Sequence, residues 1–214
     1  MTHPEKFGFI FSVAGIAFFA FAFVIMAAAP ILMLKDVEVK EVEQLAETVN
    51  PDFIQLAEDY PQEFKQHFGE ADTKSFADAL TLGRDTYVAE ACWHCHSQFV
   101  RPVSKEHIRF GRVSTADEYM NKLQLPQLFG TRRVGPDLIR QSGKHSNDWH
   151  MAHFYEPTNV VPVSVMPSYS WFFDANKRPT KKALALTAYV QWLGSWYRPD
   201  LTDAYKLPSS GGGQ

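Results

Sequence analysis

The sequence predicts a mainly α-helical protein, in which a single N-terminal transmembrane helix is followed by one folded domain. Three observations support this class: an uncharged apolar run near the N-terminus, apolar residues at helical spacing further on, and few patterns typical of strands. Apolar residues make up 45% and charged residues 21% of the chain, which is ordinary for a folded protein. The formal net charge of -3 gives no sign of a nucleic-acid partner.

Residues 1–34 are expected to form a membrane anchor. No charged residue lies between Phe7 and Leu34, and this run exceeds the roughly 20 residues that a helix needs to cross a bilayer core. A cleaved signal peptide is the alternative, because three alanines at 27–29 offer small residues near the end of the run. The apolar core of a signal peptide is usually about 7 to 15 residues long, which favours the uncleaved anchor. Both interpretations export the rest of the chain.

Residues 35–74 are expected to form an acidic, partly helical connector. They contain 11 Asp/Glu against 4 Lys/Arg, a net charge of -7, and Pro51 and Pro61 are expected to break the helical pattern. A solvated connector explains this charge, and a docking surface for a basic protein is the alternative. The domain itself is expected at 75–208, followed by a disordered Gly- and Ser-rich tail at 209–214.

The segment 73–91 shows the pattern of an amphipathic helix. The residues on or near its apolar face are Phe76, Leu80, Gly83, Tyr87 and Val88. Glycine inside a helix costs about 1 kcal/mol relative to alanine. Gly83 therefore predicts the close approach of another helix.

Three further helices are expected from their capping residues. Ser114 and Ser146 are suitable N-caps for short helices in the middle of the domain. Thr180 is expected to cap a last helix with apolar residues at helical spacing, and Gly194 is a suitable residue to end it.

The two cysteines of the chain, Cys92 and Cys95, belong to one Cys-x-x-Cys-His motif that ends at His96. This motif is the attachment pattern of c-type haem. The two thiols would bond to the two vinyl groups of one haem, and the histidine would be the proximal ligand of the iron. A lone disulfide or a redox dithiol would not need the histidine, and a zinc site would need two more ligands at metal spacing. The motif therefore predicts one covalent haem c.

The iron of such a haem needs a second axial ligand, for which methionine and histidine are the candidates. Met166 lies in a loop between Pro162 and Pro167, which would stiffen the loop and hold a ligand at low entropy cost. His150 or His153 is the alternative ligand.

The segment that begins at Arg132 is the other notable pattern. Gly135 and Pro136 predict a tight turn, whose carbonyl side could accept the Nδ1 proton of His96 and so orient the imidazole ring. Arg132 or Arg133 could pair with a haem propionate. The alternative for each arginine is a solvated surface charge.

Four ordered blocks carry a resemblance to a known family. The blocks are Tyr87–Pro102, Gly130–Leu138, Ser146–His150 and Val160–Trp171. Together they resemble the monohaem subunit (subunit II) of cbb3-type cytochrome c oxidase, in which the haem motif is followed by Ser-Gln, an apolar pair and Arg-Pro. Residues 103–107 depart from the family pattern, which is more acidic and begins with an aromatic residue.

The resemblance implies a class I-like cytochrome c domain with Cys92 and Cys95 as thioether sites, His96 as proximal ligand and Met166 as distal ligand. It implies a single-pass protein of the bacterial inner (cytoplasmic) membrane, with the haem domain on the periplasmic side. The implied partners are a catalytic haem–copper oxidase subunit, other cytochrome subunits of the complex, and a soluble or anchored electron donor. The chain would be a non-catalytic electron-transfer subunit in aerobic respiration.

Three other functions compete with this one. They are a freestanding anchored cytochrome that shuttles between complexes, the cytochrome subunit of a nitric oxide reductase, and a haem-based gas sensor. A sensor needs an open iron site, which Met166 as a ligand would close. No nucleophile–base pair, phosphate loop or carboxylate dyad stands out, so the redox step would belong to the cofactor and not to protein side chains.

Overall fold

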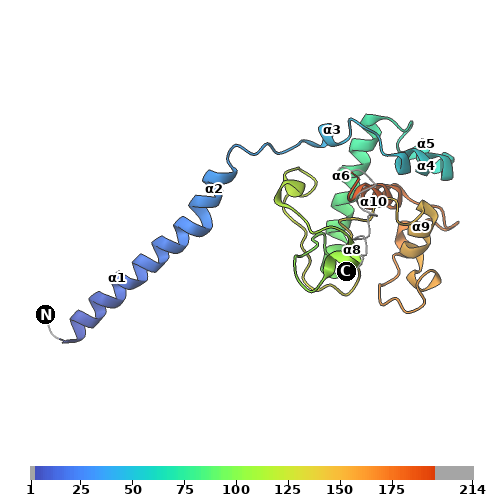
Figure 1. Cartoon of the computed structure of the whole chain (residues 1–214). Coiled ribbons are helices and arrows are strands. Elements are labelled where there is room, and N and C mark those ends of the chain that lie inside the picture. Colours follow the sequence, from blue (N-terminus) through green and yellow to red (C-terminus); the bar gives the residue numbers. More distant parts are fainter. Residues whose placement is uncertain (1–2, 196–214) are drawn as a thin grey trace, which may run out of the picture. The chain divides into compact units, whose positions relative to one another are not determined.

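The computed structural model describes residues 3–195, and the chain divides into two compact units, 1–38 and 39–214. Both units are helical (Figure 1). Across residues 3–195 the only extended pairings are two isolated β-bridges. The expected fold class, mainly α with one N-terminal apolar helix that could span a membrane, is confirmed.

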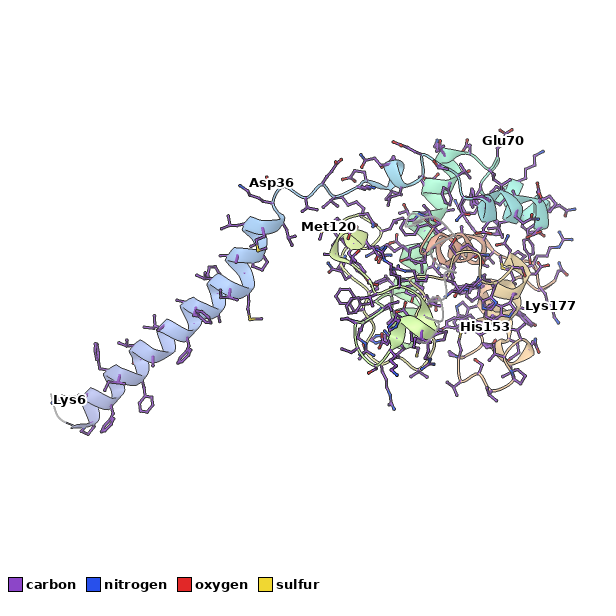
Figure 2. All side chains as sticks on the ribbon, viewed as in Figure 1. Lys6, Asp36, Glu70, Met120, His153 and Lys177 are labelled. Carbon is purple, nitrogen blue, oxygen red and sulfur yellow. The ribbon has the colours of Figure 1, made fainter. Side chains whose placement is uncertain are left out.

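The first unit is a long apolar helix with one irregular turn. Its parts are α1 (His3–Phe23), the π-helical turn η1 (Val24–Ala28) and α2 (Ala29–Leu34). The irregular turn comes just before Pro30, which lacks the N–H for a regular helical bond. The span from Pro4 to Leu34 has 31 residues, and at 1.5 Å per residue it is about 46 Å long. That exceeds a bilayer core of roughly 30 Å, and apolar side chains surround the helix (Figure 2).

The second unit is built on the crossing of α6 (Thr73–Ala89) and α10 (Lys181–Trp192). A Cβ atom on Gly83 would lie 2.1 Å from the carbonyl oxygen of Ala185 and 2.6 Å from Cβ of Tyr189. The two helices therefore touch where Gly83 lacks a side chain, and the expected close approach is confirmed. Helix α10 is buried continuously from 183 to 192, which makes it the central helix of the domain.

Helix α6 begins and ends with clear local signals. Asp72 caps it in a reciprocal pair with Ser75, in which each side chain accepts a hydrogen bond from the other residue's backbone N–H, at 2.7 and 3.0 Å. The buried part of the expected apolar face comprises Phe76, Leu80, Gly83 and Tyr87. Val88, by contrast, is 36% exposed. The helix ends at Ala89, two residues earlier than expected, and Ala91 then takes a left-handed conformation with φ 56°.

The acidic segment contributes three short helices to the second unit. They are α3 (Val42–Leu45), α4 (Pro51–Asp59) and α5 (Pro61–His67). The helical pattern is interrupted at Pro51 and Pro61 as expected, and each proline stands at the start of the next helix. The first helical position tolerates proline, since its N–H would have no partner there.

The apolar side chains of this segment are part of the domain core. Phe53, Leu56 and Phe64 are fully buried, and the ring centroids of Phe53 and Phe76 lie 4.9 Å apart. None of the Asp and Glu side chains between residues 39 and 74 is buried. The segment therefore packs one face against α6 and α10 and presents its acidic groups to solvent.

The remaining helices are short and surround the α6–α10 pair (Figure 1). They are α7 (Cys92–Cys95), α8 (Glu106–Phe110), η2 (Ala116–Tyr119), α9 (Asn147–Tyr155), η3 (Pro157–Asn159) and η4 (Ser170–Phe172). Ser146 caps α9 as expected, with its hydroxyl accepting from the N–H of Trp149 at 3.2 Å. The tail at 209–214 lies outside the described residues.

Two expected caps differ in detail. The element after Ser114 is a 3₁₀-helix capped by Thr115, while the Ser114 hydroxyl accepts from the N–H of Val100. Helix α10 starts after Thr180 as expected, but the Thr180 hydroxyl donates to the carbonyl of Phe172 instead of capping the helix. In both cases the hydroxyl hydrogen-bonds to a backbone group 14 or 8 positions away in the sequence and is not used as a helix cap. Beyond the end of α10, Gly194 takes the expected left-handed conformation, with φ +93°.

Candidate haem site

The Cys-x-x-Cys-His motif forms a separate helical turn, α7, directly after α6. Its two cysteines are free thiols, with Cys95 exposed and Cys92 half-buried. Residues three apart on a helix lie on one side, so both sulfurs can bond to one flat group. Burial raises the pKa of the Cys92 thiol to about 12. The thiol therefore stays protonated at neutral pH and is not a ready nucleophile.

The imidazole of His96 is oriented by a backbone carbonyl. Its Nδ1 lies 2.9 Å from the carbonyl oxygen of Pro136, which is the contact expected from the sequence. A proton on Nδ1 leaves the lone pair of Nε2 available for a metal. Burial lowers the pKa of His96, while Pro136 and Asp137 partly oppose that effect. The ring is therefore neutral at physiological pH, which is the form that binds iron.

The backbone of Gly135 lies directly against the imidazole ring of His96. A Cβ atom at this position would be 2.3 Å from Cε1 and 2.7 Å from Nδ1 of the imidazole. Two backbone hydrogen bonds hold the turn against the motif, from the N–H of Gly135 to the carbonyl of Cys95 at 3.0 Å and from Arg132 to His94 at 3.1 Å. Only glycine leaves room for the ring in this place.

A buried carboxylate joins the chain after His96 to the turn that carries Pro136. Asp137 is 2% exposed and accepts hydrogen bonds from the Ser97 hydroxyl at 2.6 Å, the Phe99 N–H at 2.8 Å and the Ile139 N–H at 3.0 Å. Burial raises the pKa of Asp137, and these hydrogen bonds oppose the increase. The sequence analysis missed this residue, although an acidic side chain directly after a Gly-Pro turn was a usable signal.

The two arginines of this segment have different surroundings. Arg133 uses all three guanidinium nitrogens inside the protein, with Nε 2.6 Å from the Ser97 hydroxyl, one terminal nitrogen 2.5 Å from Glu106 and the other 2.7 Å from the Phe99 carbonyl. These contacts favour a structural role for Arg133. Arg132 is exposed and stays the predicted partner of a haem propionate.

The loop that carries Met166 lies beside the haem motif. The side chain of Tyr169 lies next to the Cys92 thiol, and the indole N–H of Trp171 lies 3.4 Å from the carboxylate of Glu90. Met166 itself is half-buried and packs against the core. The fold thus brings the predicted distal ligand and the predicted attachment site to the same region of the domain.

The alternative ligands, His150 and His153, lie on α9 (His153 in Figure 2). His150 is 3% exposed, and burial lowers its pKa to about 3. His153 stacks on Trp149 with ring centroids 4.7 Å apart, and burial lowers its pKa to about 4. Both rings belong to an aromatic cluster in the domain interior. This packing favours Met166 over either histidine as the distal ligand.

The residues present fit a haem better than a bare metal ion. Among residues 3–195, no group of three or more His, Cys, Asp or Glu side chains could hold a metal ion. Apolar side chains of the Met166 loop and the Pro136 turn are instead strongly exposed: Val163 is 88%, Val165 76% and Val134 51% exposed. Two thiols, a neutral imidazole, a thioether and uncovered apolar side chains are the groups that a covalent haem would use.

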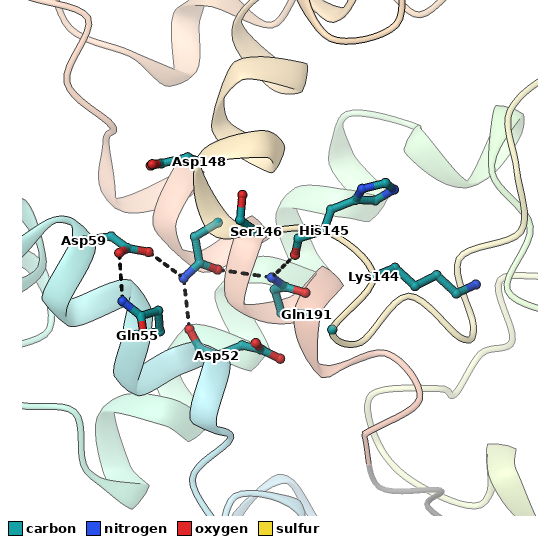
Figure 3. A pocket seen from close by; sticks show the side chains of 10 residues that line it. Asp52, Gln55, Asp59, Lys144, His145, Ser146, Asp148 and Gln191 are labelled. Carbon is teal, nitrogen blue, oxygen red and sulfur yellow. Dashed lines mark hydrogen bonds between the residues drawn. The ribbon is translucent and has the colours of Figure 1, made fainter. Parts of the chain in front are cut away.

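A separate polar pocket of about 430 Å³ lies where α4, α9 and α10 meet (Figure 3). Asn147 donates to the Asp52 carbonyl at 3.2 Å and to the Asp59 carboxylate at 3.0 Å. Gln191 donates to the His145 carbonyl at 2.8 Å. These hydrogen bonds join the three helices, and no residue of the haem motif lines the pocket. We therefore interpret the polar side chains of this pocket as structural links between the helices.

A helical domain that presents a paired-thiol motif, a carbonyl-oriented histidine and uncovered apolar side chains belongs to the class of haem-binding electron-transfer proteins. The family model described as "Cytochrome C oxidase, mono-heme subunit/FixO" matches residues 65–206. The chain belongs to this family, so the resemblance found in the sequence is confirmed. The protein is a cytochrome c oxidase subunit that takes part in electron transfer with one haem. A comparison with curated proteins found no match.

Proposed function

We propose that this chain passes electrons, one at a time, through a covalently bound haem c to the catalytic subunit of a membrane-bound cbb3-type haem–copper oxidase. The observation that carries the proposal is the haem motif with its proximal histidine already oriented, Nδ1 of His96 lying 2.9 Å from the Pro136 carbonyl. It occurs in a chain of the mono-heme oxidase subunit family. When bound, the haem supplies a centre that takes up and releases single electrons.

Each residue of the site has a proposed task. Cys92 and Cys95 hold the haem through thioether bonds, and His96 is the proximal ligand. Met166 is the distal ligand, and a Met/His pair raises the reduction potential toward that of an electron carrier. Pro136 keeps the imidazole in the correct tautomer and increases its basicity through the Nδ1 hydrogen bond.

The rest of the chain places this haem where it is needed. The apolar helix from Pro4 to Leu34 anchors the subunit in the bacterial inner membrane. The haem domain lies on the periplasmic side, where a soluble or anchored donor reduces it. Further cytochrome subunits and the oxygen-reducing subunit are its partners in the complex.

The proposal is tested by purifying the complex from its native membrane. The full chain carries an affinity tag and is extracted in mild detergent, and the reduced-minus-oxidised spectrum of the purified material is recorded. We expect haem b absorbance, a component that binds carbon monoxide, and oxygen consumption that exceeds nitric oxide consumption. Haem staining that survives a denaturing gel at the mass of this chain would establish the covalent bonds.

Two results would contradict the proposal. Haem c absorbance alone, from stable and gently extracted material, would favour a freestanding carrier. Nitric oxide consumption without oxygen consumption would place the chain in a nitric oxide reductase.

A further inference from the structure

Helix α8 and the loop before it form a surface of basic and apolar side chains that is separate from the haem site. We call it the α8 surface and define it by Val103, Lys105, His107, Ile108 and Arg109, all of which are exposed. Ile108 is 71% and Val103 54% exposed. Isolated exposed apolar residues are common, but two of them framed by cationic side chains, one in α8 and one in the loop before it, form an amphipathic patch.

The backbone is unusual where this surface begins. Ser104 and Lys105 are consecutive non-glycine residues in the left-handed region, with φ 55° and 53°. Each such residue costs on the order of 1 kcal/mol. These two strained residues lie in an exposed loop between Val103 and α8, and both Val103 and Ile108 are exposed on the surface of the domain.

The surface is nevertheless firmly attached to the domain. Glu106, in the middle of α8, is 4% exposed and pairs with both Arg101 and Arg133. Its second carboxylate oxygen accepts from the N–H of Arg101 at 2.9 Å. The ring of Phe110 is buried below, with the guanidinium groups of Arg109 and Arg133 at 4.9 and 5.0 Å from its centroid.

These contacts connect α8 to the proximal side of the haem site. Arg133 binds Glu106 on one side and the Ser97 hydroxyl on the other, and Ser97 directly follows His96. The α8 surface is therefore a rigid neighbour of the proximal histidine. A partner docked there would sit close to the proposed haem.

We propose that the α8 surface docks an acidic surface with an apolar centre, on a protein that exchanges electrons with this haem. Residues 101–112 contain four Lys/Arg and one acidic residue, Glu106, which is buried and pairs with Arg101 of this segment and with Arg133. The exposed charge is therefore positive and complements an acidic partner, which it would steer into contact. Ile108 and Val103 supply the apolar centre that a protein interface needs. The redox nature of the partner rests on the function proposed above.

An anionic membrane surface fits these observations less well. Interfacial membrane binding usually relies on a long amphipathic helix with a broad apolar face. Helix α8 has five residues, of which Phe110 points into the core and Glu106 into an ion pair. That leaves too small an apolar face to hold a lipid surface.

The test places a photo-cross-linking residue, benzoylphenylalanine, at Ile108 in the full haem-bearing chain within its native membrane. The matched control carries it at Ile54, which is 45% exposed on α4. After illumination, the partner peptide is sequenced. We expect the Ile108 probe to react with a protein segment of net negative charge that the Ile54 probe does not reach.

A second pair of variants tests the role of charge. Lys105→Glu is expected to lower the yield of this adduct at least threefold, whereas Lys182→Glu, the same charge change at an exposed position of α10, leaves it unchanged. Haem content and reduction potential should equal those of the parent chain in both variants. An electrostatic contact should also weaken as salt increases.

Several outcomes would overturn the inference. They are an adduct with lipid, with a second copy of this chain or with a neutral or basic segment, no adduct at all, or an adduct insensitive to Lys105→Glu. The two proposals fail differently. If the parent haem is not reduced by respiratory substrates in the membrane, the electron-transfer function fails. If it is reduced normally and the Ile108 probe finds no acidic partner, only the docking surface fails.

Discussion

Replacing Gly135 by alanine gives the strictest test of the proximal geometry. The added methyl group would lie 2.3 Å from Cε1, 2.7 Å from Nδ1 and 2.8 Å from Nε2 of His96, whereas ordinary contacts begin near 3.4 Å. The ring or the turn must therefore move by 3.4 − 2.3 = 1.1 Å. The side chains of a functional site usually tolerate a displacement of only about 0.5 Å from their working positions. The backbone hydrogen bonds of the turn resist its movement, so we expect the ring to leave the position from which it would bind the haem iron.

The expected result has two parts. Overpacking of this kind costs about 1–3 kcal/mol, which urea unfolding of the haem-bearing domain would measure. The displaced ligand should also convert part of the low-spin haem to a form that binds carbon monoxide.

Gly143→Ala is the matched control, because Gly143 has φ +68° but nothing within 4 Å of an added Cβ. It should lose about 1 kcal/mol of stability from backbone strain and keep its ligands. If Gly135→Ala retained the parent spectrum and lost less than about 0.5 kcal/mol, the argument from ring contact would be wrong.

Three further predictions concern the ligands and the aromatic cluster. Met166→Ala should leave the haem attached and lower the reduction potential substantially, and an unchanged potential in a redox titration would exclude Met166 as a ligand. Cys92→Ala or Cys95→Ala should weaken covalent attachment, so haem that stays on the double variant in a denaturing gel would refute the thioether assignment. Burial lowers the pKa of His150 to about 3, so between about pH 6.5 and 3 the unfolded chain binds the extra proton. Stability should be complete above pH 6.5 and fall by about 2 kcal/mol between pH 6.5 and 5, and unfolding curves of His150→Gln should lack this part of the decline.

The sequence predicted those features that depend on local pattern. The apolar run, helix α6 and the last helix each have a periodicity or a composition that one segment alone can show. Gly83 also followed from local reasoning, because a costly glycine in a helix needs a packing explanation. The contact of Pro136 with His96 was accessible because a Gly-Pro turn has a defined geometry.

The features that were missed depend on context. The interruption at Pro51 was expected, but the burial of Phe53 from the helix that begins there depends on packing in the core. Thr115 and Ser114 are both suitable caps, but Glu118 three residues after Thr115 completes a capping box and would have favoured Thr115. The acidic composition of residues 35–74 suggested a solvated connector. It gave no sign of the apolar face that α4 and α5 bury in the core.

Long-range ion pairs form a second class of features that spacing could not predict. Arg133 and Glu106 are 27 positions apart, and their pairing depends on how two loops are folded around Ser97. From the sequence, Arg133 was expected either to pair with a haem propionate or to be a solvated surface charge. In the structure it neutralises a buried carboxylate, because an unpaired charge in that place would be strongly destabilising.

The two sides of the proposed haem are held in different ways. On the proximal side, the carbonyl of Pro136, the carboxylate of Asp137 and the backbone of Gly135 all fix the surroundings of one ring, His96. On the distal side, the loop of Met166 is anchored beyond Met166 itself, where the Tyr169 N–H donates to the Phe154 carbonyl at 2.8 Å. If Met166 is the distal ligand, its side chain would have more freedom to adjust to the haem than the ring of His96. Substitutions on the proximal side should therefore disturb stability and ligation together, and substitutions in the distal loop should change the potential with little effect on unfolding.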